Sequence, residues 1–226
     1  MNYIKFSYTY NVAKLCAELE AVLQEEWPLH FNTRDFNGDW RSISLRSVSG
    51  ASKDIYAHAN GAYSDTPVLT RMPYVKEILD AWQCEKEAVR LLSLAPGSVI
   101  KPHRDPGCSY DDGHFRIHIP IITNPQVQFI LEDEQLPLKA GECWYMNFSA
   151  THSIINNGSS ARIHLVIDGI RNSWTDELFT AHGYRLTDKH AVENLDATTR
   201  TRMIEELEKM DTAASRELVA RLKAAQ

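Results

Sequence analysis

The chain has 226 residues, of which 43% are hydrophobic and 24% are charged, as in an ordinary globular protein. Its net charge of −6 argues against a nucleic acid partner held by bulk electrostatics. No apolar run approaches the roughly 20 residues of a membrane-spanning helix, and the N-terminus lacks the pattern of a signal peptide. We therefore expect no membrane partner. None of the four cysteines forms a Cys-x-x-Cys pair, which argues against a zinc ribbon or a thioredoxin-type motif, and the simplest account is reduced thiols in a cytoplasmic protein.

The N-terminal part, 1–87, is predicted to be a flank of helices and irregular chain that packs on a separate core. Apolar residues at three- and four-residue spacing predict a helix over 11–27. Turn-forming residues dominate 30–72, although 40–46 alternates like a short strand. A proline at a first helical position opens a second predicted helix over 73–83.

The next part, 88–170, changes to short apolar segments between turns and is the predicted core. Many short strands at this spacing indicate a sandwich or a barrel, a class that includes jelly rolls. The candidate strands are 88–94, 98–102, 115–122, 126–132, 142–148, 151–156 and 161–168.

The last part, 171–226, is predicted to be a helical segment. It contains candidate helices over 197–210 and 213–224, for which Asp196 and Asp211 are candidate N-caps. The charged residues of the first of these helices are most simply a solvated face. The same helix would instead form a homodimer surface if its apolar side were exposed. That side consists of Met203, Leu207 and Met210.

A histidine and a carboxylate two residues apart follow one of the predicted strands. His103 and Asp105 could reach one metal ion together, and His152, at the start of a later strand, could complete the set. Two histidines and one carboxylate on one face are typical of non-haem iron(II) sites. Because His-x-Asp is a common tripeptide, the pair alone is more simply structural. Arg162 opens a neighbouring strand, where its guanidinium could hold a carboxylate or form a surface ion pair.

Several short motifs occur together in this part of the chain. They are Pro96-Gly97, Pro102-His103-Arg104-Asp105, Arg116-Ile117-His118, Gly141-Glu142-Cys143-Trp144, His152-Ser153 and the run from Arg162 to Asp168. With them, the region 90–170 resembles the aspartyl/asparaginyl β-hydroxylase family of iron(II)- and 2-oxoglutarate-dependent oxygenases. Within that family the chain looks most like the bacterial branch that acts on free amino acids and includes proline hydroxylases.

The resemblance implies a mainly β fold with flanking helices around a double-stranded β-helix, a cupin-like jelly roll. It implies that His103, Asp105 and His152 are the iron ligands of the catalytic site. Arg162 would hold the distal carboxylate of 2-oxoglutarate, and His118 would contact the same co-substrate. Because Asp105 completes the ligand set, halogenation is not expected, since halogenating relatives lack this carboxylate.

Three further residues are candidates for binding the substrate. Arg116 matches a family position that is implicated in binding a substrate carboxylate. Arg90 could do the same, although an arginine in a strand is more simply paired with a structural carboxylate. His164 alternates with Arg162 and so shares its face of the strand, which makes it a candidate pocket residue.

Two departures from the family pattern argue against proline as the substrate. Asn147 stands where the proline-hydroxylating relatives carry aspartate, and Ser93 stands where they can carry a second arginine. Both are expected near the pocket. The loop 106–114 has no assigned role, and its position beside the ligands makes it the expected place of substrate choice.

The function implied by the resemblance is that of a dioxygenase using Fe(II), 2-oxoglutarate and O2. It would hydroxylate a C–H bond of a free amino acid or a small amino-acid-like metabolite, which would bear a carboxylate. An Asp or Asn side chain in a peptide or protein is the alternative substrate. A non-catalytic cupin-like binding protein and a cupin enzyme without 2-oxoglutarate are alternatives from other classes. A complete ligand set together with Arg162 argues against both.

Overall fold

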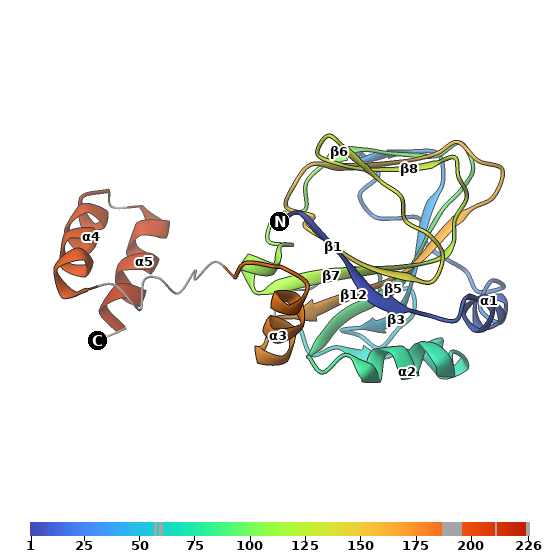
Figure 1. Ribbon diagram of the computed structural model, residues 1–226, viewed down its shortest axis with the longest axis horizontal. Helices are drawn as coiled ribbons and strands as arrows, with labels where there is room; N and C mark the ends of the chain where they lie inside the picture. The colour runs from blue at the N-terminus through green and yellow to red at the C-terminus, as the bar shows by residue number, and fades with distance from the viewer. Residues whose placement is uncertain (57, 59–60, 187–195, 211, 225–226) are drawn as a thin grey trace. The chain divides into compact units, whose positions relative to one another are not determined.

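Two compact units, residues 1–185 and residues 186–226, make up the chain (Figure 1). The computed structural model describes all residues except 57, 59–60, 187–195, 211 and 225–226. The first unit is mainly β, and its strands form two antiparallel sheets.

The larger sheet has seven strands in the order β1-β10-β7-β12-β5-β3-β4. Its central strands β7, β12 and β5 are each nine residues long and mostly buried, which fits their nearly continuous apolar sequence. Polar residues on these strands are therefore exceptions that need a partner or a function. The strands are β1 (Tyr3–Thr9), β3 (Trp40–Ser47), β4 (Ser64–Asp65), β5 (Lys86–Leu94), β7 (His114–Ile122), β10 (Glu142–Met146) and β12 (Arg162–Ile170).

The smaller sheet has five strands in the order β2-β6-β11-β8-β9. An apolar cluster joins it to the larger sheet, with residues such as Ile100 and Phe129 from the smaller sheet and Leu94 and Met146 from the larger. The two facing antiparallel sheets confirm the predicted jelly-roll core. The strands are β2 (Phe36–Asn37), β6 (Val99–His103), β8 (Val127–Leu131), β9 (Glu134–Leu136) and β11 (His152–Asn156).

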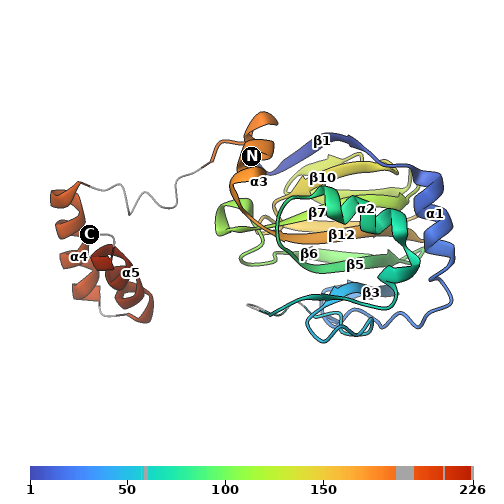
Figure 2. The ribbon, with the colours of Figure 1, turned by 90° about the horizontal axis from the view of Figure 1, so that it is seen from below.

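Helices α1 (Val12–Glu20) and α2 (Pro73–Ala81) lie on the other face of the larger sheet (Figure 1 and Figure 2). Their buried residues, which include Leu15 and Val75, join a second and larger apolar cluster with the strands beneath them. Helix α3 (Ser173–Ala181) follows β12 and begins at a capping box formed by Asn172. Both sheets also contribute polar side chains to a cavity, such as His103 from β6 and Arg116 from β7.

The predicted strands of the core are confirmed within two residues at their ends, but the N-terminal part differs from its prediction in its first helix and in its strands. The first helix ends at Glu20 rather than at 27, because the chain turns there and the Trp27 indole N–H donates to the Val22 carbonyl at 3.1 Å. Strands β1, β2 and β4 of the N-terminal part were not predicted, and neither was β9 in the core. β1 pairs with β10, a partner that lies far away in the sequence.

The second unit consists of helices α4 (Ala197–Met210) and α5 (Ala213–Ala224), at the positions that the sequence predicts. The Asp196 carboxylate accepts hydrogen bonds from the backbone N–H groups of Thr198 and Thr199, which confirms it as the cap of α4. Asp211 lies outside the described residues. With 14 residues, α4 is the longest helix among the described residues. None of the described helices is suited by length and hydropathy to span a membrane.

Candidate metal centre and its pocket

The three predicted ligands come together between the sheets. His103 is the last residue of β6 and His152 is the first residue of β11, and these antiparallel strands place the two residues opposite each other. Their ring centroids are 4.2 Å apart. Asp105 follows β6, with Oδ1 3.8 Å from His103 Nε2. One ligand atom from each of the three residues lies within 4.8 Å of the other two, which is close enough to hold one metal ion.

The backbone fixes which nitrogen each histidine offers. His103 Nδ1 lies 2.8 Å from the Lys101 carbonyl oxygen, and His152 Nδ1 lies 3.1 Å from the Ala150 carbonyl oxygen. A carbonyl oxygen only accepts hydrogen bonds, so both Nδ1 atoms must carry the proton. Both Nε2 atoms are then lone-pair donors, as metal coordination requires, and the carbonyls act as the outer partners that orient ligating histidines.

The protonation states of the ligands also suit a metal. Burial alone would raise the pKa of Asp105, but the Arg116 guanidinium, with His152 and His103, holds it below its ordinary value. Burial lowers the pKa of His152 to about 4. At neutral pH the site therefore offers an ionised carboxylate and a neutral imidazole. This donor set fits iron(II).

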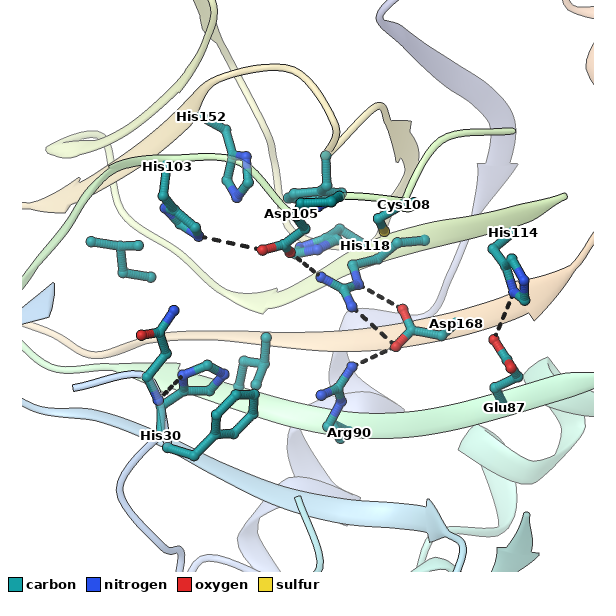
Figure 3. Close-up of a pocket in the computed structure, with 18 of the residues that line it drawn as sticks. His30, Glu87, Arg90, His103, Asp105, Cys108, His114, His118, His152 and Asp168 are labelled. Carbon is teal, nitrogen blue, oxygen red and sulfur yellow. Dashed lines mark hydrogen bonds and ion pairs between the residues drawn. The ribbon is translucent and has the colours of Figure 1, made fainter. Parts of the chain in front are cut away.

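A cavity of about 450 Å³ opens at the three ligands, and Figure 3 shows the side chains around it. Its size is that of a small-molecule pocket. Of the predicted residues, Arg90, Arg116, His118 and Arg162 also line it. His164 does not line it and instead contacts Arg162 through a hydrogen bond. Neither Ser93 nor Asn147 contributes to the lining of this cavity.

Arg162 is a buried cation without an acidic partner. Its side chain is 1% exposed, and within the described chain no carboxylate forms an ion pair with it and its Nε has no hydrogen-bond partner. Burial lowers its pKa to about 9. Its Nη2 donates to His164 Nδ1 at 2.9 Å. An unpaired guanidinium in a cavity is costly unless a ligand supplies the anion, and a carboxylate matches its geometry.

His118 and His164 form the polar wall beside Arg162. Because His164 Nδ1 accepts from Arg162, His118 Nδ1, which lies 3.2 Å from it, must be the donor of the contact between the two rings. Burial, followed by the charge of Arg162, lowers the pKa of both histidines well below the ordinary value. Both rings are therefore neutral, and His118 stacks on Phe148 at a centroid distance of 5.0 Å.

Arg116 and Arg90 share one buried carboxylate, Asp168. Arg116 Nε lies 2.6 Å from Asp168 Oδ1. Arg90 Nη2 lies 2.5 Å from Asp168 Oδ2 (Figure 3). Arg116 also reaches Asp105. Arg90 thus has the structural pairing that the sequence left open. Asp168 was missed as a functional residue, although alternation along β12 puts it on the same face as Arg162.

The loop 106–114 forms part of the pocket wall, and Tyr110 anchors its middle. Tyr110 is fully buried, its hydroxyl lies 2.7 Å from Asp176 Oδ1, and its ring stacks on Phe179 at 3.7 Å between centroids. At the end of the loop, His114 Nδ1 lies 3.0 Å from Glu87 Oε2. The loop residues Pro106, Gly107, Cys108 and His114 face the cavity.

Comparison with known proteins identifies the family of this chain. Two curated relatives are L-proline cis-3-hydroxylase 1 of Streptomyces sp, 29% identical over 58% of this chain and 47% of that protein, and L-proline cis-4-hydroxylase of Rhizobium meliloti (strain 1021), 26% identical over 70% of this chain and 57% of that protein. The chain thus spans about half the length of the curated relatives it matches.

Among solved structures, a Pseudomonas putida prolyl-4-hydroxylase covers 76% of this chain and 94% of its own, with 11% identity and a TM-score of 0.49. The fold assignment rests on the strand topology rather than on this similarity. The family model described as aspartyl/asparaginyl beta-hydroxylase matches residues 9–172, which is more than half of the chain. The chain belongs to the aspartyl/asparaginyl β-hydroxylase family.

Proposed function

We propose that this protein is an Fe(II)- and 2-oxoglutarate-dependent dioxygenase that hydroxylates a C–H bond of a free amino acid or a small amino-acid-like metabolite. The observation that carries the proposal is Arg162, a buried guanidinium without an acidic partner in the described chain, in the same cavity as the three candidate ligands. The names of the curated relatives, which are proline hydroxylases, support a free amino acid as the substrate class.

Each residue of the cavity has a role in this proposal. Iron(II), 2-oxoglutarate and O2, when bound, supply the oxidation of the C–H bond. The Nε2 atoms of His103 and His152 and one oxygen of Asp105 hold the ion. Arg162 binds the distal carboxylate of 2-oxoglutarate, and His118 contacts the same molecule from the cavity wall.

The substrate carboxylate is assigned to the arginines near Asp168. Arg90 is 4% exposed, and its Nε has no hydrogen-bond partner in the described part of the chain. Arg116 uses one N–H group on Asp105 and two on Asp168. Arg90 therefore has the freer donor, whereas Arg116 mainly positions its two carboxylates. His164 acts through Arg162 by accepting one of its hydrogen bonds.

The test is substrate-dependent release of succinate. The purified protein with Fe(II), ascorbate and 2-oxoglutarate is screened against free amino acids, with and without a chelator. We expect one group of amino acids to raise succinate release, and the chelator to abolish it. If no amino acid or peptide raises metal-dependent succinate release, the proposal fails in favour of a non-catalytic binding protein or a cupin enzyme that does not use 2-oxoglutarate.

Arg162→Ala tests the co-substrate assignment directly. Loss of one partner of a buried charged hydrogen bond costs about 2–5 kcal/mol, so the Kd for 2-oxoglutarate should rise by roughly 30-fold or more. Calorimetry without O2 measures this affinity separately from turnover. Arg41→Ala is the matched control, because Arg41 is an exposed arginine of β3 that pairs with Asp39 outside the cavity. Equal affinity in both variants would contradict the role of Arg162.

An Asp or Asn side chain in a peptide or protein is the second candidate substrate. The description of the matching family names aspartyl and asparaginyl residues, which favours this alternative. A panel of short peptides with a central Asp or Asn, assayed beside the free amino acids, separates the two. Succinate release with the peptides and none with the free amino acids would replace the first proposal by the second.

A further inference from the structure

Three flat rings form one wall of the cavity. His30 stacks on Trp40 with ring centroids 3.5 Å apart and an interplanar angle of 13°. It also stacks on Phe31, with centroids 4.4 Å apart and an angle of 27°. All three residues line the cavity. We call these three residues the ring wall.

The backbone holds the ring wall in place. The His30 N–H donates to the Trp40 carbonyl at 2.8 Å, and Leu29 forms an isolated bridge with Arg41, so the segment before β2 lies along the start of β3. Trp40 is 7% exposed and is packed in the apolar cluster between the sheets. The inner part of the wall is thus rigid and set by the fold.

The ring wall carries no charge. Burial, followed by the nearby charges of Arg90 and Arg116, lowers the pKa of His30 to about 3. The imidazole is therefore neutral at any physiological pH, so it adds an uncharged ring to the stack with Trp40 and Phe31.

The outer end of the wall is open. Phe31 lines the cavity and is 44% exposed, and its ring lies against that of Tyr56, with centroids 4.9 Å apart. An exposed aromatic surface beside a polar site often marks a place where a ligand binds. Two aromatic rings in contact gain about 0.5–1.5 kcal/mol beyond the area they bury, and this corresponds to a factor of roughly 2 to 10 in affinity.

The opposite side of the cavity is charged. Figure 3 shows His30 across the open space from His103 and Asp105, with Arg90 and Asp168 further along the same cavity. A molecule that fills this space meets charges on one side and rings on the other. The main-chain groups of an amino acid fit the charged side, and a large apolar side chain fits the rings. Three methylene groups of proline would cover little of the wall.

We propose that the substrate is a free amino acid with a large apolar or aromatic side chain, which packs on the ring wall of His30, Phe31 and Trp40. This inference rests on the proposed function, and it deepens that function by naming the substrate class. The ring wall is then the specificity-determining part of the pocket, while Arg90 binds the carboxylate that all amino acids share.

The experiment compares binding of L-phenylalanine, L-leucine, L-proline and L-aspartate to the full chain with Fe(II) and 2-oxoglutarate under anaerobic conditions, by calorimetry. We expect the first two to bind more tightly than the last two. Phe31→Ala should weaken L-phenylalanine by about 2- to 10-fold and leave L-proline unchanged. A merely structural role for Phe31 would affect all ligands alike. Tyr8→Ala, at an exposed aromatic residue of β1, is the control and should change neither.

Two results overturn the inference: tighter binding of L-proline or L-aspartate than of the apolar pair, or an equal effect of Phe31→Ala on every ligand. Both leave the proposed function intact if succinate release still depends on some amino acid. Conversely, absence of metal-dependent succinate release from every substrate would overturn the proposed function. The calorimetry would then still decide whether the wall selects apolar side chains.

Discussion

Arg116 Nη1 lies 2.8 Å from Asp105 Oδ2, so a guanidinium already occupies one oxygen of the candidate metal-binding carboxylate. The other oxygen, Oδ1, is the atom that lies 3.8 Å from His103 Nε2. Asp105 can therefore offer a single oxygen to an ion while the second is held by a cation. Outer partners of this kind orient the carboxylate before the ion arrives.

Arg116→Lys tests this orientation. Lysine keeps the positive charge, so the electrostatic effect on the metal changes little, but it cannot bridge Asp105 and Asp168 with the fork of a guanidinium. We expect the affinity for Fe(II), or for Co(II) as a probe, to fall by roughly 10- to 100-fold, as for other outer partners of metal ligands. Anaerobic metal titration measures it.

Arg171→Lys is the matched control for that variant. Arg171 makes the same type of bidentate contact with Asp176, at 2.6 Å from Nε to Oδ1, but it does not line the cavity. Its metal affinity should equal that of the unmodified protein. If both variants bind the metal as the unmodified protein does, the orienting role of Arg116 is wrong.

His103→Ala and His152→Ala should each remove metal binding almost completely. Each removes an Nε2 donor from a site of three ligands, so the loss should exceed the roughly 100-fold upper range for outer partners. The measurement is the same anaerobic titration, and His182→Ala, at the end of α3, should bind normally. Full substrate-dependent turnover by His103→Ala would disprove the metal assignment.

Asp168→Asn should lower the free energy of unfolding. The carboxylate of Asp168 lies between the buried Arg90 and the half-buried Arg116, and removing one partner of a buried ionic group costs about 3–5 kcal/mol. Urea denaturation measures the change. Asp39→Asn breaks an exposed pair with Arg41 and should cost less than about 1 kcal/mol. An equal loss of unfolding free energy in the two variants would show that the buried carboxylate stabilises the fold no more than the exposed one does.

The same residue predicts a dependence on pH. Burial would raise the pKa of Asp168, but Arg116 and Arg90 hold it below its ordinary value. A carboxyl group with a lowered pKa in the folded state contributes stability that is complete above its unfolded pKa of about 4 and is lost as the pH falls through its folded pKa. The difference in unfolding free energy between the protein and Asp168→Asn should therefore be constant near neutral pH and shrink below about pH 4. A constant difference down to pH 3 would contradict the assigned direction.

Tyr110→Phe tests the anchor of the loop 106–114. The phenylalanine keeps the stack on Phe179 but removes a hydroxyl that contacts Thr175 at 2.9 Å and Asp176 at 2.7 Å. Leaving buried partners without their hydrogen bonds costs about 1–3 kcal/mol, which denaturation in urea would detect. Tyr8→Phe, at a partly exposed tyrosine, should have no such effect. If Tyr110→Phe is as stable as the unmodified protein, the hydroxyl does not hold the loop.

The strands of the core could be predicted from the sequence because their apolar runs end at clear turn residues, as at Pro96-Gly97. Strand β1 was not predicted, because it joins the sheet only through its pairing with the distant β10, as in the pair of Tyr3 with Met146. The end of α1 at Glu20 depends on the position of Trp27, which is a tertiary contact. Local pattern thus gave the elements, and long-range pairing decided where they end and meet.

The candidate site divides in the same way. The three candidate metal ligands and Arg162 could be identified because they belong to short sequence motifs. The role of Asp168 depends on register, since β7 and β12 place it directly opposite Arg116. Alternation correctly put His164 on the face of Arg162, yet it contacts that residue through a hydrogen bond and does not line the cavity. The ring wall brings His30 from an irregular segment onto Trp40, and no periodic pattern predicts such a contact.

Because His152 pairs with His103 across β11 and β6, binding of a metal ion at these residues would depend on correct alignment of the two strands. A shift of this strand pairing by one residue would put the two imidazoles on opposite faces of the sheet. A misaligned molecule would then have no ligand set. Any ion that binds only the aligned form raises the stability of that form by mass action. An ion bound at this site would therefore favour the correctly aligned sheet, and the amide protons of β6 and β11 should exchange more slowly with the ion than without it.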